Sequence, residues 1–144
     1  MDPLTIASTV ITISSHCIQT AKAISGLKDK YKNAQMMITA IYTELTVVSA
    51  SLGHIQGLIS RDPATLETSL QSRPELQQTF DQALTGCILV FSVLDDEIQK
   101  LHEGADNIVG RVTYMWKDES MKELLSQIRG QQTALTLLIQ AFQM

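Results

Sequence analysis

A long run of apolar residues, spaced alternately four and three apart, constrains this chain more than any other feature. The run extends through Ala34, Ile38, Ile41, Leu45, Val48, Leu52, Ile55 and Ile59 without a break. Because an α-helix has 3.6 residues per turn, this spacing places every member on one face of a helix of about seven turns. A half-buried strand would instead alternate apolar and polar residues. The segment therefore predicts a long amphipathic helix that must pack its apolar face against other elements.

Three further segments show the same period and begin at helix start signals. Asp2 and Pro3 open the first, because an aspartate accepts the free amides of a first turn and proline has no amide to satisfy there. Ser72 and Pro74 open another long segment, and Asp118 opens the last. Their apolar stripes run through Leu76, Phe80, Ala83, Cys87, Val90, Leu94, Ile98 and Leu101, and through Met121, Leu125, Ile128, Leu135, Ile139 and Phe142.

Shorter helical pieces complete the pattern. Asp62 and Pro63 predict a short helix through Leu66 and Leu70. A second short stripe consists of Ile108, Val112 and Trp116, which makes Trp116 a candidate core anchor. Since the apolar period nowhere changes to two, the sequence predicts an all-α fold. We expect a helical bundle of four long helices with one or two short extra helices, forming a single domain over residues 1–144.

The first helix differs from the others because it is apolar on more than one face. One stripe consists of Leu4, Ala7, Ile11, Ser14, Ile18 and Ala21, and a second of Ile6, Val10, Ile13, Cys17 and Ile24. No charged residue lies between Pro3 and Ala21. We therefore expect a central helix that ends at a cap on Gly26. Its many hydroxyl groups and the acidic Asp2 argue against a signal peptide or a constitutive membrane span.

Charge is unevenly distributed along the chain. The formal net charge of −4 does not fit the basic surface of a nucleic-acid binder, so we expect no nucleic-acid partner. In residues 1–33, however, four lysines against two aspartates give +2, which leaves −6 for the rest. These lysines are Lys22, Lys28, Lys30 and Lys32. Lys28, Lys30 and Lys32 lie on a predicted turn from Leu27 to Lys32, the basic turn, and Lys22 precedes it in the first helix.

Small residues within the stripes have mainly structural interpretations. Cys17 and Cys87 lie in apolar stripes, where free cysteines act as small buried hydrophobic residues. Two unpaired thiols suit a cytoplasmic location. Gly53 and Gly57 lie four residues apart, which leaves open a close-packing notch or a membrane dimer motif.

No pattern of residues predicts a catalytic, cofactor or metal site. His16 and His54 each lack a second His, Cys or carboxylate three or four residues away, and His102 has only Asp106 at this spacing, which is too few ligands for a helical metal site. The chain has no glycine-rich phosphate loop and no nucleophile elbow. The acidic residues 95–97 are expected to form a solvated face, in which Lys100 can pair with Asp96. We therefore expect no enzyme, no cofactor and no metal.

The two ends of the chain carry a family resemblance. The opening MDPLTIASTVITI, followed by the lysine-rich turn, is similar to the start of fungal HeLo-like N-terminal domains. The chain also resembles these domains near its other end, where they close with a tryptophan and a leucine-rich helix. The matching residues are Trp116-Lys117-Asp118, followed by Met121, Leu124, Leu125, Ile128, Leu135, Leu138 and Ile139. The chain departs from some membrane-active relatives, which carry a glycine-zipper-like first helix, because it has no glycine before Gly26.

The resemblance implies a cytoplasmic bundle at the front of a longer, NLR-like protein, ahead of a NACHT or repeat domain that is not in this chain. The apolar pattern running up to Met144 suits such an N-terminal domain. Family members, among them the HeLo domain of the HET-S incompatibility protein, take part in fungal programmed cell death and incompatibility. The best understood relatives expose their N-terminal helix and disrupt the plasma membrane when they oligomerise.

Two functional hypotheses follow. In the first, the chain is a signalling domain that forms a homo-oligomer on activation and is recruited to an anionic plasma membrane. Its membrane-acting residues would be Leu4, Ile6, Val10, Ile11 and Ile13, and its anionic-lipid contacts Lys22, Lys28, Lys30 and Lys32. In the alternative, the chain is a protein-interaction or dimerisation bundle with no membrane activity.

Overall fold

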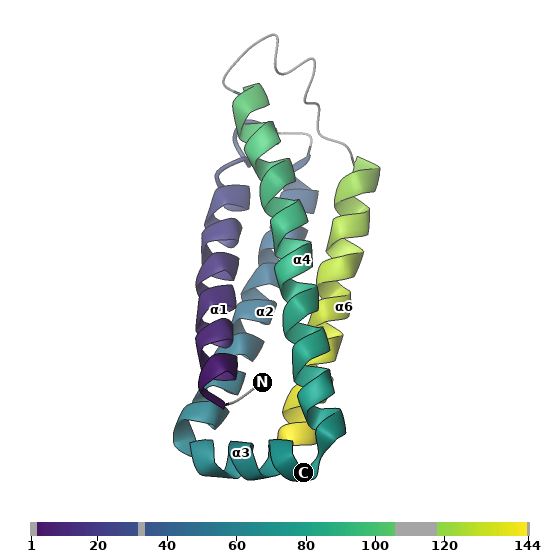
Figure 1. Ribbon diagram of the computed structural model, residues 1–144. Helices are drawn as coiled ribbons and strands as arrows, with labels where there is room; N and C mark the ends of the chain where they lie inside the picture. Colours follow the sequence, from purple (N-terminus) through teal and green to yellow (C-terminus); the bar gives the residue numbers. More distant parts are fainter. Residues whose placement is uncertain (1–2, 32–33, 106–117, 144) are drawn as a thin grey trace.

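The computed structural model describes residues 3–31, 34–105 and 118–143, and no strand occurs within them (Figure 1). Their helices are α1 (Pro3–Ser25), α2 (Gln35–Arg61), α3 (Pro63–Ser72), α4 (Pro74–Ala105) and α6 (Asp118–Gln143). Four of these are long and one is short, which confirms the predicted all-α bundle. The predicted stripe that ends in Trp116 lies outside the described residues, so the anchor role of Trp116 stays a prediction.

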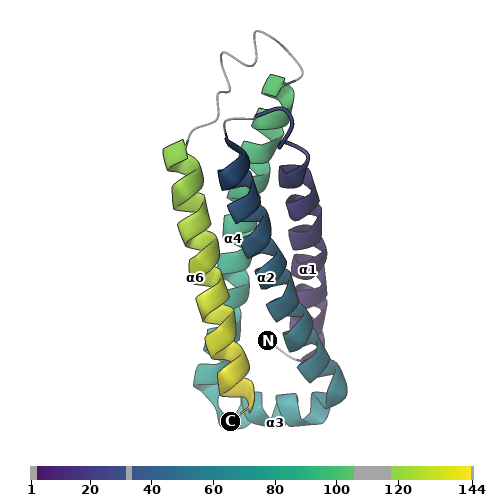
Figure 2. The same ribbon diagram turned by 180° about the vertical axis from the view of Figure 1, so that it is seen from behind.

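The four long helices stand side by side in a ring. α1 packs against α2, α2 against α6, α6 against α4, and α4 against α1. Figures 1 and 2 show the same neighbours from opposite sides. α1 and α4 run in the same direction, α2 and α6 run in the other, and α3 crosses the lower end of the bundle in both views. Each long helix therefore turns one face toward the common core.

The predicted stripes form most of the core, which also includes Leu84 and Phe91 of α4 and Leu124 and Leu138 of α6. All seven buried residues of α2 belong to its stripe. Every member of the predicted α4 stripe is buried, including Leu94 with no exposed surface. On α6 the stripe is buried as far as Leu135, whereas Ile139 and Phe142 near the end are only half-buried. Helical period alone was sufficient to identify these faces because each helix meets the core along a single stripe.

The start of α3 follows its predicted signal. The Asp62 carboxylate accepts a hydrogen bond of 3.1 Å from the backbone N–H of Thr65, and Pro63 occupies the first helical position. The Thr65 hydroxyl also donates to the Asp62 carboxylate. The hydrogen bond from the hydroxyl and, to a smaller extent, the one from the backbone lower the pKa of Asp62. The side chain thus satisfies an amide that the first helical turn leaves without a partner.

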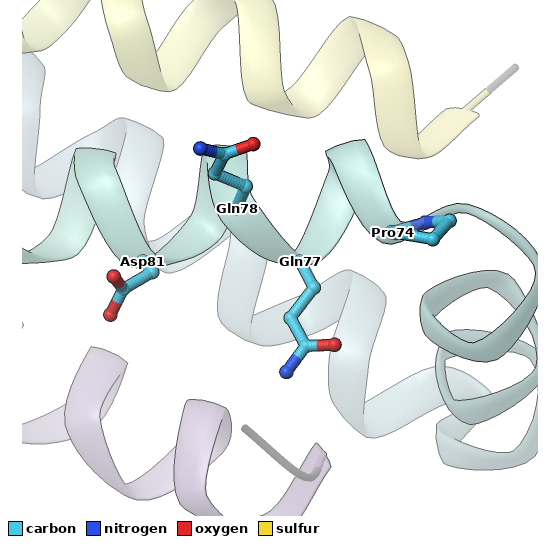
Figure 3. A pocket seen from close by; sticks show the side chains of 4 residues that line it. All are labelled: Pro74, Gln77, Gln78 and Asp81. Carbon is cyan, nitrogen blue, oxygen red and sulfur yellow. The ribbon is translucent and has the colours of Figure 1, made fainter.

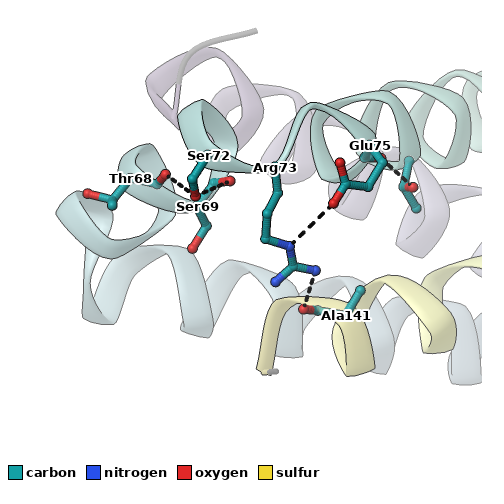
Figure 4. Close-up of polar contacts among 7 residues, drawn as sticks. Thr68, Ser69, Ser72, Arg73, Glu75 and Ala141 are labelled. Carbon is teal, nitrogen blue, oxygen red and sulfur yellow. Dashed lines mark hydrogen bonds and ion pairs between the residues drawn. The ribbon is translucent and has the colours of Figure 1, made fainter.

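The corner between α3 and α4 ties the lower end of the bundle to the end of α6 (Figure 4). The Arg73 guanidinium donates to the backbone carbonyl of Ala141 at 3.0 Å, and its Nε lies 3.8 Å from Glu75 Oε1. The last carbonyls of a helix have no partner within the helix and carry partial negative charge. Arg73 therefore caps α6 from another part of the chain.

α1 ends at Ser25, directly before Gly26, as predicted. Gly26 does not adopt a left-handed conformation, because no described glycine has a positive φ, and its N–H donates to the Lys22 carbonyl at 3.1 Å. Gly53 and Gly57 form no close-packing notch within the bundle, because a Cβ added at either position would meet nothing within 4 Å. Both lie on a part of α2 that faces open space.

Gln131 and Gln132 interrupt the apolar stripe of α6, and their side chains contact two different neighbouring helices. The side chain of Gln131 lies against Gly86 of α4, so closely that a Cβ added at Gly86 would collide with it. Gln132 accepts a hydrogen bond of 3.0 Å from the Ser51 hydroxyl of α2. The polar break in the stripe therefore marks where α6 passes between its two partners.

Candidate functional site on the first helix

The two apolar stripes of α1 have different surroundings. Ile6, Val10 and Ile13 are buried in the core. On the other stripe, Ile11 is 50% exposed and Ile18 is 44% exposed. These two residues lie seven positions apart, which is two turns, so they point the same way from the helix. The remaining predicted membrane-acting residue, Leu4, has its side chain outside the described part of the structure.

The expectation of a central first helix is therefore wrong. α1 is one of four ring members, and its main neighbours are α2 and α4. Four long helices can surround a shared core without enclosing any one of them, which leaves the outer face of each in solvent. As a result, the stripe of α1 that includes Ile11 and Ile18 is only partly covered by the described chain.

The predicted lipid-contacting lysines lie where α1 passes into α2. Lys22 is exposed in the last turn of α1. In the turn at residues 26–30, Lys30 is exposed and Lys28 is half-buried, while Leu27 is fully buried and anchors the turn to the core. Lys32 lies outside the described residues. Lys22, Lys28 and Lys30 thus lie at one end of the bundle.

The structure does not bring these lysines together with the predicted membrane-acting residues. Nine positions separate Ile13 from Lys22, which corresponds to roughly 14 Å along the helix axis. The apolar residues occupy the first half of α1 and the basic residues its far end. The two groups could therefore meet one flat surface together only if α1 lay along it.

A polar cluster between α1 and α4 is the feature that sequence reasoning missed. The Asp95 carboxylate of α4 accepts a hydrogen bond of 2.7 Å from the Thr20 hydroxyl through one oxygen, and its other oxygen contacts His16 Nε2. His16 and Thr20 lie one turn apart on α1, so one carboxylate bridges both. We call these three residues the Asp95 latch. The prediction that residues 95–97 only form a solvated face is wrong for Asp95.

The neighbourhood of the latch is partly apolar and partly wet. The side chains of His16 and Asp95 are 32% and 42% exposed, whereas Thr20 is 1% exposed. The His16 ring packs edge-on against Phe91, with ring centroids 6.0 Å apart. The neighbouring carboxylate of Asp96 instead pairs with Lys100 of its own helix at 3.1 Å, as predicted.

Two further polar contacts join α4 to the end of α1 and to the chain that follows it. His102 Nε2 of α4 lies 3.1 Å from the backbone carbonyl of Ala23, near the end of α1. The Tyr31 hydroxyl, in the chain that follows α1, donates to the Leu101 carbonyl at 2.7 Å. Polar contacts to α4 therefore occur from His16 of α1 to Tyr31, beyond the end of this helix.

Cys17 and Cys87 are free and buried, as predicted. Burial raises the pKa of Cys17 to about 12, with nearby Cys87 as a second cause, and burial raises the pKa of Cys87 to about 12. The Cys17 thiol donates to the Leu45 carbonyl at 3.2 Å. Because the thiolate is the reactive form of cysteine, both thiols are inert near neutral pH. They act as core residues.

The pocket in Figure 3 does not form a chemical site. It is a shallow depression at the start of α4, lined by Pro74, Gln77, Gln78 and Asp81. Figure 3 shows Gln78 pointing away from the side on which Gln77 and Asp81 lie, so these groups do not converge on one point. Across the residues that the structure describes, no group of three or more His, Cys, Asp or Glu could hold a metal ion.

Within the described residues one helix is long and apolar enough to cross a membrane, and that helix is α2. Length and composition are weak evidence, because core helices of water-soluble proteins pass the same test. α1 does not reach this level.

Comparison of the chain with protein-family models, with curated proteins and with solved structures found no match. The resemblance to HeLo-like domains thus rests on the sequence pattern alone.

Proposed function

We propose that this chain is a signalling and effector module of fungal programmed cell death or incompatibility, which oligomerises and targets an anionic membrane through α1. The cell-death role follows from the resemblance to HeLo-like domains. The membrane role has a physical basis in the chain itself.

The observation that carries the proposal is the pair of apolar stripes on α1. Ile11 and Ile18 already face solvent, and Ile6, Val10 and Ile13 would join them if α1 left the core. No charged residue interrupts the helix from Pro3 to Ala21. The freed helix would then present one broad apolar face opposite a face of hydroxyl groups, a surface that a membrane interface or a like helix can cover.

The basic turn adds an electrostatic contribution at the end of the same helix. Each lysine near an anionic membrane surface contributes on the order of 1 kcal/mol of binding free energy. Lys22 and Lys30 are exposed at that end. The chain as a whole is acidic, with a net charge of −4. Binding is therefore expected to depend on this end of the bundle and to weaken with salt.

A matched pair of charge reversals tests the membrane role. Lys22→Glu and Arg61→Glu each reverse one exposed basic residue in the last turn of a helix, at opposite ends of the bundle. In co-sedimentation with vesicles containing phosphatidylserine, Lys22→Glu should reduce binding about tenfold and Arg61→Glu should change it little. Both variants should be compared with wild type, as the free chain and fused to a segment that forces oligomerisation. Failure of both wild-type forms to bind would refute the membrane role.

The alternative function, a protein-interaction bundle, has its own supporting observation. Leu89 and Val93 of α4 are 62% and 51% exposed, lie one turn apart, and adjoin the exposed Ile88. An apolar patch of this kind on one helix face is suited to a second helix. Sedimentation velocity would test it: the Leu89→Ser/Val93→Ser variant should lose any self-association that the wild-type chain shows without lipid.

A further inference from the structure

We propose that the Asp95 latch is an autoinhibitory contact, which holds α1 against α4 and must open before α1 can reach an anionic membrane. This inference rests on the proposed function of α1 and identifies the contact that regulates it. Four observations support it.

The first observation is that the Asp95 carboxylate contacts α1 through both of its oxygens. One Asp95 oxygen accepts from Thr20 and the other contacts His16, so both of its oxygens engage side chains of another helix. The adjacent Asp96 pairs within α4 through Lys100. Two consecutive carboxylates of one helix thus have different roles, and only one of them joins α4 to α1.

The second observation is that the latch can open without leaving a buried polar group unpaired. The Thr20 hydroxyl also lies 2.9 Å from the backbone carbonyl of His16 in its own helix, so it keeps a partner when Asp95 moves away. An unpaired hydroxyl in an apolar environment would be costly. Here the single hydroxyl proton switches from the Asp95 carboxylate to the His16 carbonyl, so the hydroxyl donates a hydrogen bond in both states.

The third observation is that water already reaches the other two members. The side chains of His16 and Asp95 are about one third and two fifths exposed. Water can therefore replace their mutual contact as soon as the helices separate, and the opened groups are not transferred into an apolar environment.

The fourth observation is the position of the latch between the two predicted membrane elements. Residues 16 and 20 lie between the apolar first half of α1 and the basic turn that begins beyond Lys22. A contact at this point restrains both parts of the helix. Opening it would let α1 lie along a surface with its apolar and basic residues together.

Asp95→Ala and Asp96→Ala form a matched pair that tests the latch. Both remove one negative charge from the same turn of α4, but only the first removes contacts to α1. In hydrogen–deuterium exchange without lipid, Asp95→Ala should accelerate the amides of residues 16–25 about tenfold relative to those of α6. Asp96→Ala should leave this ratio unchanged. Equal ratios in the two variants would overturn the latch.

Vesicle binding of the same variants separates the latch from the membrane role. Asp95→Ala should increase binding to phosphatidylserine vesicles over wild type, and Asp96→Ala should not. If Asp95→Ala accelerates exchange without increasing binding to vesicles, the autoinhibition proposal fails although the contact is real. Binding by the forced oligomer alongside unchanged exchange in Asp95→Ala would overturn the latch and leave the proposed function standing.

Thr20→Val provides a second variant in case Asp95→Ala does not fold. Valine has nearly the shape of threonine and suits a position that is 1% exposed, so the core should remain intact. The substitution removes one of the two contacts to Asp95. Exchange in residues 16–25 should therefore increase by a smaller factor than in Asp95→Ala. An unchanged exchange rate would count against the latch.

Discussion

α1 is held on its two sides by different kinds of contact. Toward α2 the contact is extensive and the facing stripe of α2 is aliphatic, whereas toward α4 the contact is smaller and includes the Asp95 latch. Apolar packing is lost only when surface is exposed to water, and each buried aliphatic side chain contributes about 1.5–3 kcal/mol. Hydrogen bonds at a partly wet site exchange with bonds to water at a net loss of about 1 kcal/mol each.

The difference indicates which side of α1 opens first. Separation from α4 breaks polar contacts that water can replace and exposes a smaller apolar contact, while separation from α2 exposes the more extensive aliphatic surface. The α2–α6 interface combines both kinds of contact, because the Arg129–Glu44 pair at 3.1 Å accompanies a buried aliphatic stripe. We therefore expect α1 to move relative to α4 while α2 and α6 stay together.

The largest expected effect is on the apolar side. Leu45 is fully buried on α2, where its backbone carbonyl also accepts from the Cys17 thiol. Leu45→Ala should lower the free energy of unfolding by about 2–5 kcal/mol, the range for truncating a buried leucine. Leu94→Ala on α4, which is equally buried, should have a similar effect. Urea denaturation measures both. A loss below about 1 kcal/mol would mean that the core faces are wrongly assigned.

A smaller effect is expected on the polar side. Asp95→Ala should lower the free energy of unfolding by about 1–2 kcal/mol, because it removes two hydrogen-bonding contacts at a partly exposed site. Asp96→Ala removes only a pair within one helix and should change stability by a few tenths of a kcal/mol. A double-mutant cycle with His16→Ala measures the coupling directly. Zero coupling would show that the contact between His16 and Asp95 does not help to hold α1 against α4.

An effect of opposite sign is expected on the open part of α2. Gly53 lies within the helix, and an added Cβ would meet nothing within 4 Å. Gly53→Ala should therefore raise the free energy of unfolding by about 0.5–1 kcal/mol, because alanine is the better helix former. If this glycine instead contacts a second copy of the chain, the variant will impair self-association, which sedimentation velocity would detect.

Unfolding at alkaline pH tests the burial of the Cys17 and Cys87 thiols. Their pKa values rise from 9.0 to about 12 in the folded chain. Between these values the unfolded chain releases both protons and the folded chain keeps them, so the free energy of unfolding falls as pH rises from 9 toward 12. The Cys17→Ala/Cys87→Ala variant should show a shallower fall in this range. Parallel curves would mean that the thiols ionise in the folded state.

The sequence was sufficient to predict features that depend on one helix alone, such as its buried face or its first residue. The stripes of α2 and α4 were predictable because each lies along one helical face, and the start of α3 was predictable because Asp62 caps it locally. The Asp95 latch was not predictable, since His16 and Asp95 are 79 residues apart and meet only through the relative register of two helices. The exposure of Ile11 and Ile18 was also missed, because an apolar pattern does not reveal how many neighbours a helix has.

The most direct test measures whether α1 moves away from α4 at a membrane. Spin labels can be attached through Gln19→Cys and Ser92→Cys, at exposed positions of these helices, because the native thiols are buried and unreactive. A control pair, Val47→Cys and Leu137→Cys, reports on α2 and α6. With phosphatidylserine vesicles, double electron–electron resonance should show a longer α1–α4 distance and an unchanged α2–α6 distance. An unchanged α1–α4 distance in vesicle-bound protein would contradict the account.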